Sequence, residues 1–172
     1  MFNDYFVIPG KISLRISAVD AGLNEVAFVH SSSKTLQKPS DPAISPSFKR
    51  KAGRHLEEAK EQLAQFFEGG RQELSLPMVY TGTPFQIKVW EALLEIPFGT
   101  TVSYGELARR VRFPKAARAV GAACRENPIA LFIPCHRVIA KDGSLTGFGG
   151  GLSMKKSLLT FEKEHSHARI CC

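Results

Sequence analysis

The sequence predicts an α/β protein of two domains, in which a small antiparallel sheet with one helix precedes a mainly helical domain. Apolar and polar residues alternate in short segments of the first 30 residues, as in half-buried strands. From Phe48 to Phe67 the apolar residues recur at three- and four-residue steps, the period of an amphipathic helix. The second half repeats helix-start signals. We therefore place the domains at 1–80 and 81–172, with a linker at 77–82.

The first domain is expected to contain three strands before its helix. Pro9-Gly10 and the turn at 20–24 separate the strands. Residues 31–47 are rich in Ser, Lys and Pro without apolar periodicity, which predicts a surface loop. The helix is stopped by Gly69-Gly70, and residues 74–76 are expected to return to the sheet. The predicted strands are 5–8, 11–19 and 25–30.

A capping box predicts the first helix of the second domain. Thr83 can cap this helix, Pro84 suits its first position, and Gln86 can bond back to the cap. The helix should end at Ile96-Pro97. Its expected apolar stripe is Phe85, Val89 and Leu93, with Trp90 and Leu94 beside it.

Two shorter helices should follow. Ser103 and Glu106 repeat the capping pattern for a helix at about 103–111, and a second helix is expected at about 115–125. Their tight connection predicts a helix-turn-helix, although such pairs are also common as plain packing units. Ala and Gly surround the long side chain of Arg118, so the second helix can approach a core or a DNA groove closely.

The last helix is expected to be capped by Ser153. Its Glu162 has two interpretations, an exposed glutamate or a carboxylate that orients His136. The preceding glycine-rich segment 147–151 lacks the Lys-Ser or Lys-Thr of a phosphate-binding loop, so we interpret it as a pocket wall. The apolar face of the helix should be Met154, Leu158 and Phe161.

Cys135 follows an apolar run that predicts a buried strand ending at the thiol. His136 and Arg137 come next, and positive charge near a thiol lowers its pKa and favours the reactive thiolate. A plain core cysteine is the alternative, because a cysteine in an apolar run is often only that. The local sequence leaves both interpretations open.

Composition sets broad limits on the function. The chain has 172 residues, a formal charge of +7 and a pI near 9.4, which favours a polyanionic partner, although many basic proteins bind none. No apolar run reaches bilayer length, and the polar start is unlike a signal peptide. We expect a cytoplasmic or nuclear protein with no membrane partner. Four cysteines, two of them the adjacent Cys171-Cys172, give no disulfide framework.

An ordered set of motifs resembles the O6-alkylguanine-DNA alkyltransferases, also called methylated-DNA–protein-cysteine methyltransferases. The resemblance runs from about Thr83 to Glu162. Its motifs are Pro84-Phe85-Gln86, Val89-Trp90, Ile96-Pro97-Phe98-Gly99, Ser103-Tyr104-Gly105, Ala117-Arg118-Ala119-Val120-Gly121, Asn127-Pro128, Ile133-Pro134-Cys135-His136-Arg137-Val138 and Leu145-Thr146-Gly147-Phe148-Gly149-Gly150-Gly151-Leu152.

The resemblance implies a catalytic set. Cys135 would be the nucleophile, His136 the general base acting through an ordered water, and Glu162 the carboxylate that orients it. Tyr104 would help to rotate the target phosphate and to protonate the leaving guanine. Asn127 would brace the active-site turn through its side-chain amide.

The resemblance also implies how DNA is bound. The helix carrying Arg118 would enter the minor groove, and Arg118 would take the place of a base that is rotated out of the stack. The implied pocket residues are Val138, Phe148, Gly149 and Gly150. The implied further DNA contacts are Ser103, Tyr104, Lys115, Ala119, Gly121 and Arg125.

The implied reaction is an irreversible, stoichiometric transfer of an alkyl group from O6-alkylguanine, and from O4-alkylthymine, to Cys135. The implied partner is duplex DNA containing the alkylated base, and the protein would act as a monomer without metal or cofactor. The first domain would be ribonuclease H-like. Phe148 and Gly149 depart from members that carry tyrosine and serine there, which removes two hydroxyls from the pocket and leaves the substrate range open.

Other thiols and ligands have simpler interpretations. Cys124 is either a second thiol or a small packing residue. No cysteine precedes Cys124, which excludes a cysteine-rich zinc site from the first half. We interpret the tail residues as a frayed terminus instead of a metal site. These tail residues are His165, His167, Cys171 and Cys172.

Three other functions could use parts of the same pattern. A cysteine hydrolase or acyltransferase would need oxyanion donors and would leave the basic charge and Arg118 unexplained. A lesion-binding protein without repair activity would be expected to lack Cys135. A helix-turn-helix regulator would bind a specific duplex and form no covalent product.

Overall fold

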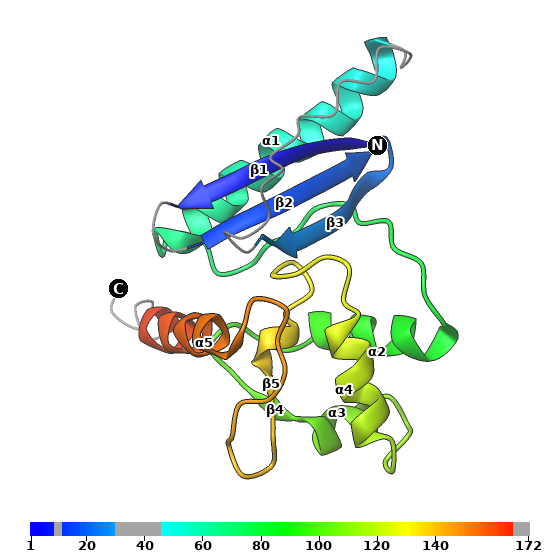
Figure 1. Ribbon diagram of the computed structural model, residues 1–172, viewed down its shortest axis with the longest axis vertical. Helices are drawn as coiled ribbons and strands as arrows, with labels where there is room; N and C mark the ends of the chain where they lie inside the picture. Colours follow the sequence, from blue (N-terminus) through cyan, green and yellow to red (C-terminus); the bar gives the residue numbers. More distant parts are fainter. Residues whose placement is uncertain (9–11, 30–45, 167–172) are drawn as a thin grey trace. The chain divides into compact units, whose positions relative to one another are not determined.

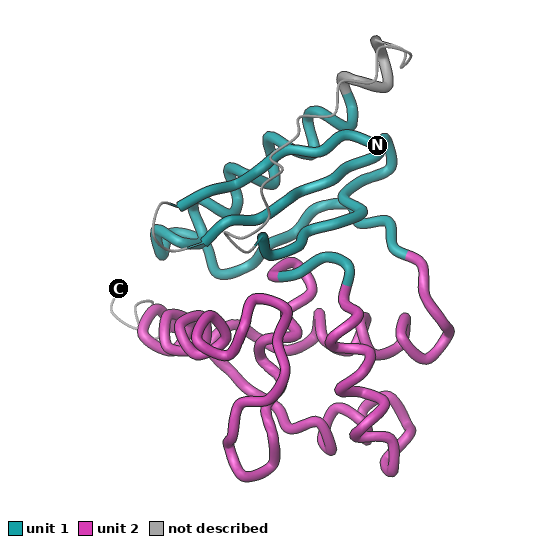
Figure 2. Tube along the Cα trace, viewed as in Figure 1, with its two compact units in different colours: residues 1–80, 128–130 teal, residues 81–127, 131–172 magenta. Residues whose placement is uncertain are grey.

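The chain has an α/β fold, and its computed structural model describes residues 1–8, 12–29 and 46–166. Two compact units are present (Figure 2). Unit 1 consists of Met1–Tyr80 with Pro128–Ala130, and unit 2 of Thr81–Asn127 with Leu131–Cys172. Among the described residues, no helix combines the length and apolarity needed to span a bilayer.

Unit 1 is a three-stranded antiparallel sheet with α1 packed on one face (Figure 1). Ile16 of the central strand pairs with Asp4 on one side and Val26 on the other. The alternation in β2 buries every second side chain against α1, as the strand and helix periods predict. The elements are β1 (Phe2–Ile8), β2 (Ile12–Val19), β3 (Gly22–Phe28) and α1 (Pro46–Phe67). Their core residues are Leu14, Ile16, Ala18, Leu56, Ala59, Leu63 and Phe66.

Strand β3 begins at Gly22, inside the segment predicted as a turn. Gly22 has φ of 147°, and a Cβ atom there would lie 2.2 Å from the carbonyl oxygen of Pro77. The backbone of Leu23 bonds to Pro77 and Val79, so the chain returns to the sheet at Met78. The predicted return at residues 74–76 is therefore wrong, and the return lies in the segment predicted as a linker. The predicted loop ends before α1 at Pro46, and its residues 31–45 lie outside the described residues.

A second correction concerns the approach to Cys135. The sequence predicted a buried strand, but only Ile129 forms an isolated bridge, to Val26 of β3. The chain then turns at Leu131, whose φ is 71°. Residues 129–134 are nonetheless buried, which explains why their apolar run imitates a strand.

In the described part of unit 2 there are four α-helices, a short 3-10 helix and a two-stranded parallel ladder. The capping box at α2 is confirmed, because Thr83 and Gln86 exchange hydrogen bonds of 2.7 and 3.2 Å. Trp90 is buried and donates to the carbonyl of Ala123 at 2.9 Å, whereas Leu94 is exposed. The elements are α2 (Pro84–Leu94), β4 (Val102–Ser103), α3 (Tyr104–Arg110), α4 (Ala117–Arg125), η1 (Cys135–Arg137), β5 (Val138–Ile139) and α5 (Leu152–Ser166).

Two helix starts and one capping box differ from the predictions. Ser103 caps α3, but Glu106 pairs with Arg109 instead of closing a capping box. Helix α4 begins at Ala117, two residues later than expected, with no side-chain cap. Helix α5 begins before Ser153, so Ser153 is not its cap.

Candidate active site

Cys135 opens the short helix η1 at the end of the buried turn. Its backbone N–H bonds to the carbonyl of Ile133 at 2.8 Å. Directly after η1, β5 pairs in parallel with β4, and β4 leads into Tyr104 at the start of α3. Only 8% of Cys135 is exposed. The ladder between β4 and β5 therefore brings the chain around Cys135 close to the chain around Tyr104.

Asn127 braces the turn that carries the thiol. Its side-chain amide donates to the carbonyl oxygen of Ile133 at 2.7 Å and to Sγ of Cys135 at 3.2 Å. An amide donor stabilises a thiolate more than a thiol, because the anion is the stronger acceptor. Asn127 can therefore both hold the turn and favour the reactive form of Cys135.

His136 and Glu162 form a buried pair. Nε2 of His136 lies 2.7 Å from Oε1 of Glu162, and the two side chains are 1% exposed. Burial alone would raise the pKa of Glu162, but His136 and Arg137 outweigh it and lower the pKa to about 2. An ionised carboxylate only accepts hydrogen bonds, so Nε2 must carry the proton. Nδ1 is then the basic nitrogen, and this buried atom has no partner among the described residues.

Arg137 holds Glu162 in place, a role that the sequence did not assign. Its Nε lies 2.9 Å from Oε2 of Glu162, and its Nη1 donates to the carbonyl of Ile96 at 2.6 Å. The guanidinium also lies over the ring of Phe98, and the Gly99 N–H donates to Oε2 at 3.0 Å. Glu162 is thus buried, ionised and fully bonded, which excludes the exposed interpretation.

The charge near Cys135 differs from the sequence prediction. Burial raises the pKa of the Cys135 thiol, while the Asn127 hydrogen bond and the Lys155 charge act to lower it. Burial also lowers the pKa of His136, which favours the neutral imidazole. Arg137 is committed to Glu162 and does not supply the expected charge. The thiol at rest is therefore protonated, and a neutral base stands beside it in the chain.

Lys155 is the second buried residue that sequence reasoning missed. It is 0% exposed and lies on α5 with Leu158 and Glu162, at steps of three and four residues. That spacing is a detectable signal, because it places a lysine on the buried stripe of the helix. The predicted stripe was Met154, Leu158 and Phe161, of which Leu158 is buried and the other two are only half-buried.

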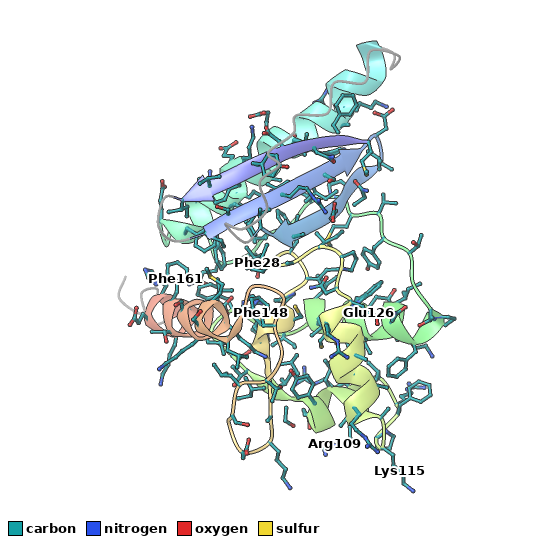
Figure 3. All side chains as sticks on the ribbon, viewed as in Figure 1. Phe28, Arg109, Lys115, Glu126, Phe148 and Phe161 are labelled. Atoms are coloured by element: carbon teal, nitrogen blue, oxygen red, sulfur yellow. The ribbon has the colours of Figure 1, made fainter. Side chains whose placement is uncertain are left out.

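The residues predicted to meet DNA cluster around α3 and α4. Four of them are exposed, and Lys115 projects away from the turn before α4 (Figure 3). Ser103 is occupied as the cap of α3, and Gly121 lies against Tyr104, since a Cβ there would be 3.7 Å from its ring. The four exposed residues are Lys115, Arg118, Ala119 and Arg125.

Of the predicted pocket residues, Val138 and Phe148 lie next to η1. Val138 is fully buried, and the ring of Phe148 meets the His136 ring edge-on at 6.4 Å between centroids. Gly149 is exposed and Gly150 is half-buried. Nothing lies within 4 Å of a Cβ built on Gly149, so that position leaves open space. Within residues 1–8, 12–29 and 46–166, no three His, Cys, Asp or Glu side chains gather as metal ligands.

Asn127→Ala is expected to lower the free energy of unfolding by about 1–3 kcal/mol, because the buried carbonyl of Ile133 loses its donor. Urea denaturation measures this change. Asn24→Ala, in unit 1, serves as the comparison, because the side-chain amide of Asn24 donates to the sulfur of Met1, which is a weak acceptor. Equal effects of the two substitutions would contradict the bracing role of Asn127.

Known proteins share both the sequence and the fold. The profile of the 6-O-methylguanine DNA methyltransferase DNA-binding domain matches residues 84–164. An inducible methylated-DNA–protein-cysteine methyltransferase of Bacillus subtilis is 50% identical over 111 residues, 64% of this chain and 62% of that protein. A methyltransferase of the same name from Methanosarcina mazei is 38% identical over 94% of this chain and 98% of its own length.

A solved structure extends the similarity to three dimensions. The crystal structure of Mycobacterium tuberculosis OGT in complex with DNA matches with a TM-score of 0.77 and 38% identity, covering 94% of this chain and 93% of that one. Together with the buried residues Cys135, His136 and Glu162, these matches place the chain in a class of DNA-associated protein-cysteine methyltransferases. The chain belongs to the methylated-DNA–protein-cysteine methyltransferase family.

Proposed function

We propose that the protein repairs duplex DNA directly, by moving an alkyl group from O6-alkylguanine, and from O4-alkylthymine, to Cys135. The observation that carries this proposal is the buried thiol, which is bonded to Asn127 and followed by a His136–Glu162 pair with one basic nitrogen. The Mycobacterium relative crystallised with DNA supports a DNA partner. The basic charge of the chain agrees with such a partner.

The reaction is a single displacement at carbon. The Cys135 proton passes through a water to Nδ1 of His136, the sulfur bonds to the alkyl carbon, and the bond from that carbon to the purine oxygen breaks. Guanine takes up a proton with the help of the Tyr104 hydroxyl, which balances the proton lost by the thiol. Burial raises the pKa of Tyr104, so its hydroxyl is protonated at neutral pH and can donate a hydrogen bond to the purine.

Each protein molecule acts once. The product is a thioether, whose carbon–sulfur bond needs another nucleophile to break it. Cys124 is the other described cysteine, and burial raises its pKa to about 12, so its thiol stays protonated. We infer that the alkyl group remains on Cys135.

The buried thiol requires the damaged base to leave the duplex, because Cys135 is 8% exposed. We propose that α3 and α4 act as a helix-turn-helix whose second helix enters the minor groove. Small residues of α4 permit close approach, and the exposed Arg118 fills the space of the rotated base. The ribonuclease H-like kinship of unit 1, the monomeric state and the cytoplasmic or nuclear location remain predictions.

Arg118→Ala is expected to slow transfer from duplex DNA by roughly 10²-fold, because an empty base stack costs a few kcal/mol. Transfer from the free base O6-benzylguanine should not change, since that substrate needs no rotation. Single-turnover rates on the two substrates measure the difference. A similar loss on both substrates would place Arg118 outside the base-flipping step.

Mass spectrometry of the intact protein tests the proposed function. A short duplex with one O6-methylguanine should add one methyl group to the peptide that contains Cys135, saturating at one per protein. An unmodified duplex should add none, and Cys124→Ala should leave the gain unchanged. Binding without a mass gain would indicate a lesion-recognition protein, and turnover of an acyl ester would indicate a cysteine hydrolase.

A further inference from the structure

Lys155 is a fully buried cation that the proposed reaction leaves without a role. Burial lowers the pKa of its ammonium group, so the fold bears a cost to keep a lysine there. A methionine would fill the same space without that cost. The hydrogen bonds of this buried lysine go to backbone carbonyls. We therefore expect its charge to have a function in the candidate active site.

Its contacts join three parts of the candidate active site. Nζ donates to the carbonyl of Val138 at 2.7 Å and to the carbonyl of Thr146 at 3.1 Å. Nζ also lies 5.8 Å from the centre of the Tyr104 ring. Thr146 in turn donates through its hydroxyl to the Tyr104 hydroxyl at 3.0 Å. One ammonium group thus ties β5, the start of the glycine-rich segment and the first residue of α3 together.

The hydrogen bonds of Lys155 go to neutral carbonyls, and within residues 1–8, 12–29 and 46–166 no carboxylate forms a salt bridge with it. The titratable groups that face it are Cys135 and His136 of η1, Cys124 of α4 and Tyr104 of α3. Its charge favours ionisation of both thiols and disfavours protonation of His136. Of the two thiols, only Cys135 also receives the hydrogen bond of Asn127.

We propose that Lys155 is a positioning residue for alkyl transfer, which supplies the positive charge that stabilises the Cys135 thiolate and fixes Thr146 and Tyr104 around it. The inference rests on the proposed function, in which Cys135 is the nucleophile. Arg137 stands closer to Cys135 in sequence, but Glu162 neutralises it. Lys155 acts on the sulfur through its charge, while its hydrogen bonds to the carbonyls of Val138 and Thr146 hold the ammonium group in place.

The sign of the effect follows from the charge. A thiolate beside a cation ionises at lower pH than the same buried thiol without one, so removal of the cation must raise the pH at which Cys135 becomes reactive. Lys155→Met removes the charge and retains an unbranched side chain that is one atom shorter. We expect the midpoint of Cys135 reactivity to rise by about one pH unit, and methyl transfer at neutral pH to fall roughly 10-fold.

The experiment measures the rate of Cys135 alkylation by iodoacetamide at a series of pH values on both sides of the ordinary thiol pKa of about 8.5, continued upward until the rate reaches its plateau. Peptide mass spectrometry separates Cys135 from the other three cysteines. Wild type, Lys155→Met, Lys155→Arg and the exposed neighbour variant Lys156→Met are compared. We expect a raised midpoint only in Lys155→Met, and recovery in Lys155→Arg, which restores the charge.

Thermal denaturation and methyl transfer complete the comparison. A Lys155→Met variant that melts earlier and reacts more slowly, but with an unchanged midpoint, would show that Lys155 only supports packing and would overturn the proposal. A wild-type protein that transfers no methyl group would refute the proposed function instead. Because iodoacetamide needs no DNA, the two failures can be told apart.

Discussion

Cys135→Ser is expected to abolish methyl transfer while leaving affinity for an O6-methylguanine duplex nearly unchanged. A serine hydroxyl fills almost the same space but is a much weaker nucleophile, and neutral His136 is too weak a base to ionise it. Loss of a nucleophile typically lowers a rate by roughly 10⁴- to 10⁶-fold. Single-turnover transfer of a labelled methyl group measures the rate, and fluorescence anisotropy measures duplex binding.

Cys124→Ser is the matched control, because Cys124 is also a buried free thiol. Its pKa of about 12 keeps it protonated, so transfer should persist in this variant. Residual transfer in Cys135→Ser that disappears when Cys124 is also replaced would identify Cys124 as the acceptor. Such a result would contradict the assignment of Cys135 as nucleophile.

Short-range signals explain what the sequence predicted well. The capping box of Thr83 and Gln86 depends on residues three apart, and the structure shows both of its hydrogen bonds. The alternation of β2 and the helical period of α1 likewise depend on neighbouring positions. Such features form from local geometry, whatever the rest of the chain does.

Long-range contacts explain what the sequence could not give. Arg137 follows Cys135 by two residues, yet its guanidinium binds Glu162, 25 residues away. The cation that acts on the thiol is Lys155, 20 residues downstream on α5. Burial also reversed the expected direction of the Cys135 pKa shift, because desolvation of the thiolate outweighs the nearby charge. Neither sequence spacing nor composition measures that balance.

The apolar run before Cys135 shows a further limit. Burial on all sides gives a buried turn the same composition as a buried strand, and periodicity cannot separate the two. The left-handed φ of Leu131 would have been hard to foresee, since leucine has no preference for it. The resemblance to the alkyltransferases predicts the site residues, and the structure shows that Arg137 bonds to Glu162 and that Lys155 bonds to the backbone of Val138 and Thr146.

Glu162→Gln is expected to lower the transfer rate by roughly 10²- to 10⁴-fold, the usual contribution of general acid–base catalysis. The carboxylate accepts bonds on both oxygens, from His136, Arg137 and Gly99. The amide introduced by Glu162→Gln must turn its NH2 group toward one of these donors. The substitution also removes the negative charge that balances Arg137. Loss of one partner of a buried ion pair should lower the free energy of unfolding by about 3–5 kcal/mol.

The acid limb of stability separates this role from simple packing. Because the pKa of Glu162 is lowered from 4.5 to about 2, its contribution is present above about pH 4.5 and is lost as the pH falls toward 2. In Glu162→Gln, the free energy of unfolding should fall less steeply as the pH is lowered. Glu164→Gln, an exposed substitution on the same helix, should show the wild-type pH dependence and the wild-type rate of methyl transfer. Urea denaturation at a series of pH values measures both variants. An unchanged acid limb in Glu162→Gln would mean that folding does not lower the pKa of Glu162, which would contradict a stabilising role for its ion pairs with His136 and Arg137.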